Sequence, residues 1–277
     1  MMLGKFHPVH VPLWGEIGRT LALLAGRVPA AHRPAQRESV ALQWSRWRAE
    51  KEARAVLRDG RGRMHPARVF HELSAVVPAD AVIPVDVGNN TYSFGRYFET
   101  KRGQTVIMSG YLGSIGFAFP AAMGAWAATR GSGRTIVSIS GDGGFGQYLA
   151  ELTTAVARGM PITHVLLDNA ELGKISKEQV AALRPVWHTD LHNPDFAASA
   201  RLCGAEGFRV EAPEDVRPAL EAALAVTDGP SLVDIVTSAR TFDPIRSGHP
   251  GSVPIIPPCG VAAGPASIPA RTGATGA

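Results

Sequence analysis

The sequence predicts an α/β fold, a doubly wound parallel sheet flanked by helices. From Met64 onward, short β-branched runs alternate with segments of helical composition. Several runs, such as TIVSI and HVLL, are almost continuously apolar, which is typical of parallel strands buried on both faces. With 45% hydrophobic and 19% charged residues among 277, the chain has the composition of a globular protein with a sizeable core.

The pattern predicts five strands and seven helices. Strands are expected at AVIPVDV (81–87), TVIMS (105–109), TIVSIS (135–140), ITHVLLD (162–168) and SLVDIVT (231–237). Helices are expected at 13–26, 39–59, 64–77, 116–130, 145–159, 193–204 and 213–226. In doubly wound sheets ligands bind at the carboxyl ends of the strands, so the residues after each strand are the candidates for a site.

Composition limits the setting and the partners. No run of about 18 apolar residues is present to span a membrane, and the N-terminus lacks the order of a secretory signal. The only cysteines, Cys203 and Cys259, are far apart, which predicts a reduced, cytoplasmic setting. Residues 27–63 carry ten Arg or Lys against four Asp or Glu. We interpret this excess as a solvated helix and linker, and expect no nucleic-acid binding.

The strongest local signal is GDGGFG at 141–146, which follows a strand and opens a helix. It satisfies the G-x-G-x-x-G pattern of dinucleotide sites, and Asp168 ends the next strand where a ribose-binding acid would lie. An NAD-dependent dehydrogenase is therefore a serious alternative.

Charge favours a different ligand. The carboxylate of Asp142 lies inside the turn and would repel a bare diphosphate, but it becomes useful if Mg²⁺ lies between them. Mg²⁺ takes about six oxygen ligands and usually combines one or two protein groups with phosphate oxygens. Asn169 directly follows the next strand and offers a second, neutral oxygen.

The span GDGGFGQYLAELTTAVARGMPITHVLLDNAELG resembles the thiamin-diphosphate motif of the acetolactate synthase and pyruvate oxidase family, which begins with GDG and ends in a pair usually written Asn-Asn. Asn169 follows Asp142 by 27 residues, the spacing of that family. The resemblance implies Mg²⁺ bound by the Asp142 carboxylate, the Asn169 side chain and the Glu171 backbone carbonyl, with Gly143 and Gly144 at the cofactor. Asp168 replaces the first Asn of the pair.

Two further stretches resemble the same family. DVGNNTYSFGRYF (86–98) implies cofactor contacts from Val87, Gly88, Asn89 and Asn90, the asparagines as donors to phosphate oxygens; alone, these asparagines could equally begin a helix. SGYLGSIGFAFPAAMGA (109–125) implies that Gly113 meets the aminopyrimidine and that Ile115 wedges between the two rings of thiamin diphosphate. Tight helix–strand packing would explain such a glycine cluster on its own.

The substrate side and the rest of the enzyme are less defined. The resemblance is greatest to the pyruvate oxidase branch, where Ile175 and Glu178 would face a 2-oxo acid such as pyruvate; a solvated helix surface is an equal alternative. Family members activate the cofactor through a glutamate of a separate pyrimidine-binding domain. We find no equivalent in this sequence, and expect an oligomer, homomeric or heteromeric, in which a partner domain or subunit supplies it. FAD could belong to the complete enzyme.

These observations predict four segments: a remnant of the family's middle domain (1–28), a linker and basic helix (29–63), a domain for thiamin diphosphate and Mg²⁺ (64–240) and a disordered tail (241–277). The tail holds seven Pro and six Gly, a composition typical of disorder. We expect a 2-oxo-acid decarboxylating or carboligating enzyme, inactive as an isolated chain. The alternatives are the dehydrogenase and a non-catalytic cofactor-binding fragment.

Overall fold

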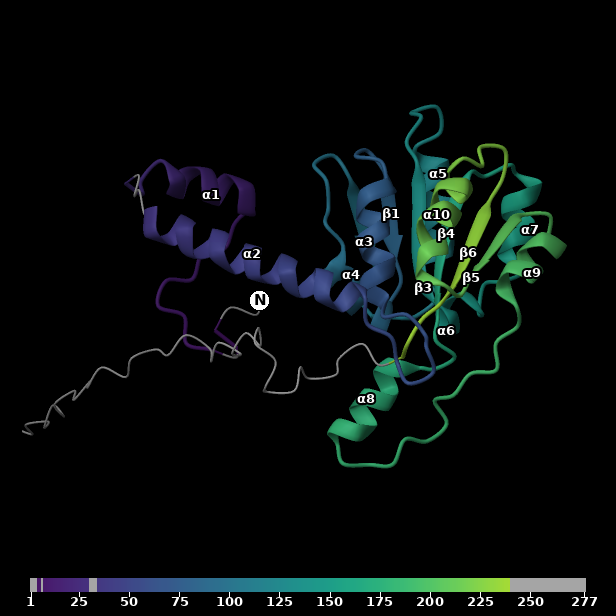
Figure 1. Cartoon of the computed structure of the whole chain (residues 1–277). Coiled ribbons are helices and arrows are strands. Elements are labelled where there is room, and N and C mark those ends of the chain that lie inside the picture. The colour runs from purple at the N-terminus through teal and green to yellow at the C-terminus, as the bar shows by residue number, and fades with distance from the viewer. Residues whose placement is uncertain (1–3, 6, 30–33, 240–277) are drawn as a thin grey trace, which may run out of the picture. The chain divides into compact units, whose positions relative to one another are not determined.

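The computed structural model describes residues 4–5, 7–29 and 34–239 (Figure 1). The predicted tail, 241–277, lies outside the described residues. The chain divides into two compact units, Met1–Arg46 and Trp47–Ala277. The first contains helix α1 (Ile17–Ala25), whose first turn is capped by the Glu16 carboxylate, and the start of α2 (Pro34–Ala55), which ends in the second unit. Among the described residues, no helix is both long and apolar enough to cross a bilayer.

The second unit is built on a six-stranded sheet in the order β2-β1-β3-β4-β6-β5. All neighbouring strands run parallel. The strands are β1 (Val82–Val85), β2 (Thr105–Met108), β3 (Ile136–Gly141), β4 (Ile162–Asp168), β5 (Glu206–Val210) and β6 (Ser231–Val236). The chain adds β2 on one side of β1 and β3 on the other, so the order reverses between β1 and β3. Such a switch point opens a crevice at the carboxyl ends of the strands.

Helices cover both faces of this sheet (Figure 1). They are α3 (Pro66–Val76), α4 (Asn89–Tyr97), α5 (Ala118–Ala128), α6 (Asp142–Phe145), α7 (Glu151–Ala157), α8 (Gly173–Ala181), α9 (Phe196–Leu202) and α10 (Val216–Leu224), with a 3₁₀ turn η1 (Pro213–Asp215). Helices α3, α4 and α10 contribute to one hydrophobic cluster, and α5, α7 and α9 to the other.

Alternating strand residues supply the two clusters. Ile139 and Val165 belong to the first, whereas Ile136 and Leu166 belong to the second. Successive side chains of a strand point to opposite faces, so apolar residues at nearly every strand position are needed to cover both. This explains why the central strands are almost continuously apolar, and the predicted fold class is confirmed.

The structure also corrects the predicted elements. All five expected strands form, but β5 was missed because EGFRV is a short edge strand with a glycine and two charged residues. Helices α4 and α8 lie in stretches that the sequence marked for ligand contacts, with a helix start and a solvated helix surface as the alternatives. The single helix expected at 145–159 is wrong: the chain forms the short helix α6, then a turn over 146–150, then α7.

Candidate cofactor site

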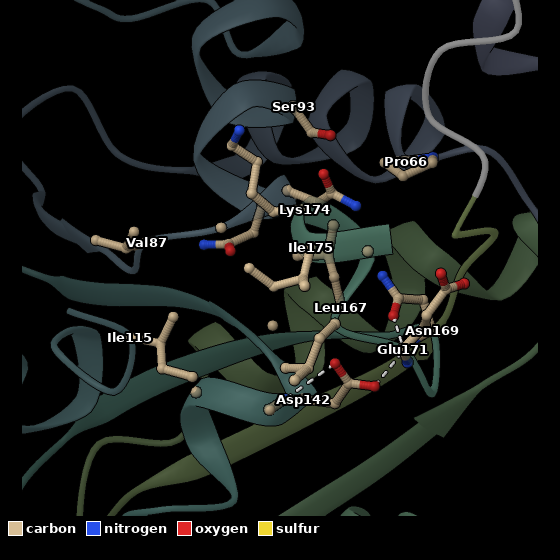
Figure 2. A pocket seen from close by; sticks show the side chains of 18 of the residues that line it. Pro66, Val87, Ser93, Ile115, Asp142, Leu167, Asn169, Glu171, Lys174 and Ile175 are labelled. Carbon is tan, nitrogen blue, oxygen red and sulfur yellow. Dashed lines mark hydrogen bonds between the residues drawn. The ribbon is translucent and has the colours of Figure 1, made fainter. Parts of the chain in front are cut away.

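A pocket of about 350 Å³ opens at the carboxyl ends of β1, β3 and β4, at the switch point (Figure 2). Every residue that the sequence marked as a site candidate lines it, from five separate segments. These residues are Val87, Gly88, Asn89, Asn90, Gly113, Ile115, Asp142, Gly143, Gly144, Asn169, Glu171, Ile175 and Glu178. The structure therefore brings together positions that lie up to 91 residues apart in the sequence (178 − 87).

Asp142 defines one end of the pocket, which we call the acid end. It directly follows β3 and is 3% exposed. Its Oδ1 accepts a hydrogen bond from the Gly143 N–H (3.0 Å), and its Oδ2 accepts from the N–H groups of Asn169 (3.2 Å) and Ala170 (2.6 Å). Burial raises the pKa of Asp142 to about 6, while these hydrogen bonds oppose the rise.

The turn after β4 is shaped by an unusual backbone conformation at Ala170. Its φ is +58°, a region that costs a non-glycine residue energy and is concentrated at functional sites. This conformation lets Ala170 donate to Asp142, while Asn169 Oδ1 accepts from the Glu171 N–H (2.9 Å). Leu172 N–H donates to the Thr189 carbonyl (2.7 Å), which holds the turn from its other side.

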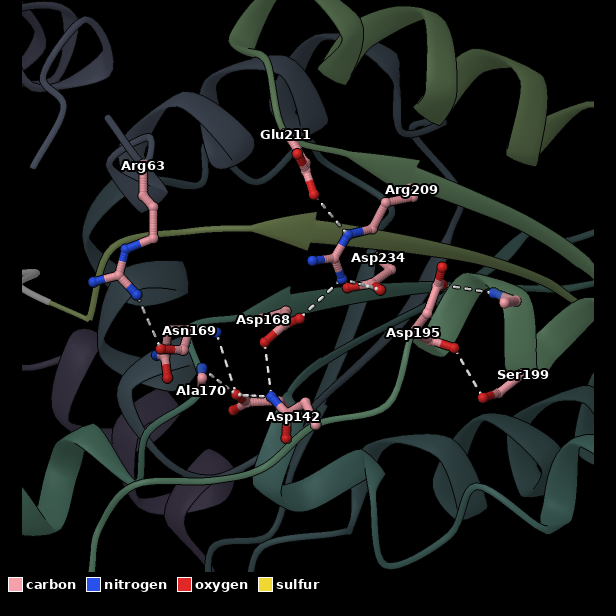
Figure 3. Close-up of polar contacts among 12 residues, drawn as sticks. Arg63, Asp142, Asp168, Asn169, Ala170, Asp195, Ser199, Arg209, Glu211 and Asp234 are labelled. Carbon is pink, nitrogen blue, oxygen red and sulfur yellow. Dashed lines mark hydrogen bonds and ion pairs between the residues drawn. The ribbon is translucent and has the colours of Figure 1, made fainter. Parts of the chain in front are cut away.

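Behind the acid end lies a chain of polar contacts that the sequence did not predict (Figure 3). The Asn193 amide donates to both Asp142 Oδ2 (2.7 Å) and Asp168 Oδ1 (2.8 Å). The Arg209 guanidinium then bonds Asp168 (3.0 Å) and the fully buried Asp234 (2.5 Å). Burial raises the pKa of Asp234 to about 6, although Arg209 lowers it. Arg209 thus offsets the negative charges of Asp168 and Asp234.

Asp86 ties the end of β1 to the glycine-rich loop. Its buried carboxylate accepts from its neighbour Val87 (2.7 Å) and from the N–H groups of Gly116 (3.0 Å) and Phe117 (3.1 Å). Burial raises the pKa of Asp86, and the hydrogen bonds oppose this. Gly144 packs directly against it, since a Cβ at 144 would overlap the Asp86 carboxylate. The third glycine position of GDGG is therefore required by close packing.

The opposite side of the pocket, which we call the donor end, belongs to α4. Asn89 and Ser93 lie one turn apart and are 9% and 1% exposed. Asn89 Nδ2 and Ser93 Oγ have no hydrogen-bond partner in the structure, yet both residues line the pocket. Buried donors of this kind are rare and call for a ligand or water. Figure 2 shows Ser93 on the side of the pocket away from Asp142.

Sequence reasoning overlooked several residues that shape the site. Asp86 belongs to the DVG segment, and its position at the end of a predicted strand could have marked it as a residue near the site. Ser93 lies four residues after Asn89, on the same helical face, so it could be found once α4 is recognised. Asn193 and Arg209 carry no local signal, because their partners come from distant strands. On the substrate side, Ile175 is 46% exposed and Glu178 pairs with Lys174.

Comparison with known proteins agrees with this geometry. Residues 86–235 match the family described as "Thiamine pyrophosphate enzyme, C-terminal TPP binding domain". The matched range is 150 of the 277 residues (235 − 86 + 1), more than half of the chain, and it includes every candidate site residue. The chain belongs to this thiamine pyrophosphate enzyme family.

Relatives of this thiamine pyrophosphate family member are longer proteins. The chain is 36% identical to the putative thiamine pyrophosphate-containing protein YdaP of Bacillus subtilis over 62% of its length and 30% of the relative's. It is 31% identical to the catabolic acetolactate synthase of Raoultella terrigena over 86% of its length and 42% of the relative's. It is 32% identical to the sulfoacetaldehyde acetyltransferase of Castellaniella defragrans over 66% of its own length and 31% of the relative's. The chain thus spans about a third of these relatives.

A solved structure supports the same fold. The thiamine diphosphate-dependent 4-hydroxybenzoylformate decarboxylase of Rhodococcus jostii RHA1 superposes with a TM-score of 0.58 at 25% identity, covering 65% of this chain and 33% of the decarboxylase. Together with the family match, this decides against the dinucleotide alternative. The structure agrees, because Asp168 is engaged by Asn193 and Arg209 instead of facing the pocket as a ribose-binding acid.

The pocket of this thiamine pyrophosphate family member fits thiamin diphosphate with a divalent metal. The acid end offers the oxygens of Asp142, Asn169 and Glu171, which are the ligand types that Mg²⁺ prefers. The donor end offers unpartnered donors, which suit anionic oxygens. Between them, Gly143 packs closely on Leu172, since a Cβ at position 143 would lie only 2.7 Å from Leu172 Cδ2.

Proposed function

We propose that this chain binds thiamin diphosphate through Mg²⁺ and forms half of the active site of an enzyme that decarboxylates or carboligates a 2-oxo acid such as pyruvate. The observation that carries the proposal is the convergence of thirteen candidate residues on one pocket with a buried carboxylate at one end and unpartnered donors at the other. A diphosphate bridged to a metal complements both ends at once.

The metal would be held by the Asp142 carboxylate, the Asn169 side-chain oxygen and the Glu171 backbone carbonyl. The left-handed turn at Ala170 supports this proposal, because it lies between Asn169 and Glu171 and its N–H donates to the Asp142 carboxylate. Only one of the three ligands is charged, so the positive charge of Mg²⁺ remains available for diphosphate oxygens.

The remaining residues would orient the organic part of the cofactor and the substrate. Bound thiamin diphosphate supplies the nucleophilic carbon and the electron sink. Ile115 and Gly113, on the loop held by Asp86, would support the rings. Ile175 and Glu178 would face the oxo acid. The relatives named as synthase, acetyltransferase and decarboxylase do not distinguish a pyruvate oxidase from an acetolactate synthase type of reaction.

A second domain or subunit would complete the site. Two glutamates line the pocket, and both already have a partner in the chain: Glu171 pairs with Ser176 and Glu178 with Lys174. Beside the pocket, Tyr111 and Leu112 are 97% and 84% exposed. Large apolar side chains exposed next to a site are typical of an interface, which fits a pyrimidine-binding partner there.

Binding of the cofactor tests the first part of the proposal. Calorimetry with thiamin diphosphate should show binding with Mg²⁺ and at least hundredfold weaker binding after chelation. Asp142→Ala should have an equally large effect because it removes the only charged metal ligand. Asp80→Ala, which removes an exposed carboxylate outside the pocket, is the matched control. Binding of NADH in place of thiamin diphosphate would refute the proposal.

Pyruvate decarboxylation tests the need for a partner. The chain alone, saturated with cofactor and Mg²⁺, should turn over at least about a hundredfold more slowly than the same chain with a pyrimidine-domain protein of the family. The loss expected from missing general acid–base catalysis is about 10²–10⁴. Turnover near one per second by the isolated chain would show that no second domain is required.

A further inference from the structure

Lys177 reaches from α8 to the donor end. Its Nζ donates a hydrogen bond to Asn89 Oδ1 at 3.1 Å. The two helices approach closely because α8 begins with Gly173, and a Cβ at this position would overlap Asn89 Nδ2. Gly173 and Lys177 are four residues apart and so share one face of α8. On that face, Gly173 packs against Asn89, and the Lys177 ammonium group one turn later donates to it.

The contact determines which way the Asn89 amide points. A lysine ammonium has three donors and no acceptor, so only the amide oxygen can face it. Partial burial lowers the pKa of Lys177 to about 8; the Glu171 carboxylate opposes this shift, and the charges of Arg96 and Lys174 add to it. The ammonium form therefore still predominates at pH 7. With its oxygen held by Lys177, Asn89 must direct its NH₂ group elsewhere, and Nδ2 is buried without a partner at the pocket wall.

Ser93 strengthens the case for a ligand at this point. Its hydroxyl is also buried and unpartnered, and Ser93 lines the pocket one turn along α4 from Asn89. Leaving a buried donor unpaired costs about 1–3 kcal/mol, so two such donors on residues that line one pocket predict an acceptor that arrives from outside the chain. The ammonium group of Lys177, which contacts Asn89, favours an anionic acceptor.

We propose that Lys177 is a positioning residue that fixes the Asn89 amide so that its NH₂ group, beside the Ser93 hydroxyl, donates to anionic oxygens of a diphosphate. This inference rests on the proposed function and assigns a role to a residue outside the pocket wall. It requires that Lys177 act through Asn89, not merely as a positive charge near the site.

A double-mutant cycle tests the proposal, with calorimetric affinity for thiamin diphosphate and for inorganic pyrophosphate, both with Mg²⁺, as the readout. Lys177→Met and Asn89→Ala should each weaken binding about tenfold or more, as expected for one hydrogen bond to a charged group. In the Asn89→Ala background, Lys177→Met should cost less than about twofold more. Lys177→Arg keeps a donor-only cation and should retain most of the affinity.

Two control variants separate the position of the Lys177 ammonium from its charge, and thermal unfolding tests whether the variants fold. Lys174→Met removes the same charge from the same helix, but its ammonium pairs with Glu178, so binding should weaken less than about threefold. Asn89→Asp keeps an oxygen for Lys177 and replaces the NH₂ donor by a second, negatively charged oxygen, so it should bind at least as weakly as Asn89→Ala. Thermal unfolding of each ligand-free variant checks that the fold is retained.

The outcomes are distinguishable. If the unmodified chain binds neither probe, the proposed function fails and this inference fails with it. If the unmodified chain binds and Lys177→Met binds as well, only the inference fails. Equal losses for the two lysine variants, or additive losses in the cycle, would show that Lys177 contributes charge alone and would overturn the positioning role. Loss of the fold in Lys177→Met leaves the decision to Lys177→Arg and Asn89→Asp, and full affinity in Asn89→Asp would refute the proposal.

Discussion

The two ends of the pocket are organised in opposite ways. At the acid end the chain satisfies its own polar groups: the Asp142 carboxylate receives four hydrogen bonds from its neighbours and from Asn193. At the donor end Asn89 and Ser93 keep buried donors without partners. Both ends follow strands of the same sheet, so the difference arises from side chains and not from the fold.

The difference indicates which end is built before a ligand arrives. A carboxylate with several hydrogen bonds in a low-dielectric site keeps its orientation without a ligand. Unpartnered donors instead lower the stability of the free protein by the cost of desolvation, and this cost is recovered when an acceptor binds. We therefore expect substitutions at the acid end to affect folding and binding, and those at the donor end to affect mainly binding.

Removing Arg209 should give the largest effect on stability. Arg209→Met leaves Asp168 and the fully buried Asp234 without their cation, and breaking a buried ion pair costs about 3–5 kcal/mol. Because Arg209 is itself 32% exposed, we expect about 2–3 kcal/mol in urea unfolding. Adding Asp168→Asn should restore part of this loss, since it removes one buried charge. Arg158→Met, at an exposed position, should change stability by less than about 0.5 kcal/mol.

If Asp168→Asn gave no recovery in the Arg209→Met background, the two residues would not be energetically coupled. The acid end would then not depend on the ion pairs of Arg209 behind it, and the claim that the acid end is stabilised before a ligand binds would be wrong.

Paired glycine substitutions compare the two ends directly. Gly144→Ala places a Cβ on the Asp86 carboxylate, and Gly173→Ala places one on the Asn89 amide. Gly144→Ala should lower the free energy of unfolding by about 1–3 kcal/mol through overpacking. Gly173→Ala should change stability by less than about 1 kcal/mol, because the Asn89 Nδ2 that it displaces makes no hydrogen bond in the free chain, but it should weaken diphosphate binding about tenfold.

Gly124→Ala is the control for both, since a Cβ there meets no atom within 4 Å and alanine favours the helix. Denaturant unfolding and calorimetry on the three variants check the prediction. Equal stability losses at 144 and 173 would show that the two ends do not differ as described.

The smallest predicted effect concerns pH and a histidine beneath the acid end. His164 is fully buried in β4, and its ring nitrogens contact the hydroxyls of Ser138 (2.6 Å) and Ser140 (2.9 Å). Burial lowers its pKa to about 3, whereas the unfolded chain has an ordinary value of about 6.5. Stability from this group is therefore complete above about pH 6.5 and is lost as the pH falls towards 3.

Linkage gives a loss of about 1.3 kcal/mol between pH 7 and 5.5 from this group. Because the buried carboxylates titrate in the same range, the measurement is the difference in unfolding free energy between the chain and His164→Gln at each pH. A difference that does not change with pH would mean that His164 is not held neutral.

The sequence alone predicted the residues that line the site better than the residues that hold those side chains in place. GDGG after a strand, and Asn169 at the family spacing, identified the acid end because these groups are close in sequence to strand ends. Strand ends of a parallel sheet meet at one edge, so local patterns were enough to indicate which residues converge. The charge of Asp142 inside the glycine turn likewise favoured a metal-bound diphosphate over a dinucleotide, before any contact in the structure was known.

Tertiary structure alone decided how that site is held. Asn193, Arg209 and Lys177 contact Asp142, Asp168 and Asn89 across 25 to 88 residues of sequence (193 − 168 for the nearest contact, 177 − 89 for the farthest). No local pattern records such contacts, because they depend on how far one helix or strand lies from the next. The edge strand β5 was missed for the same reason, since its pairing with β6 outweighs its weak intrinsic preference.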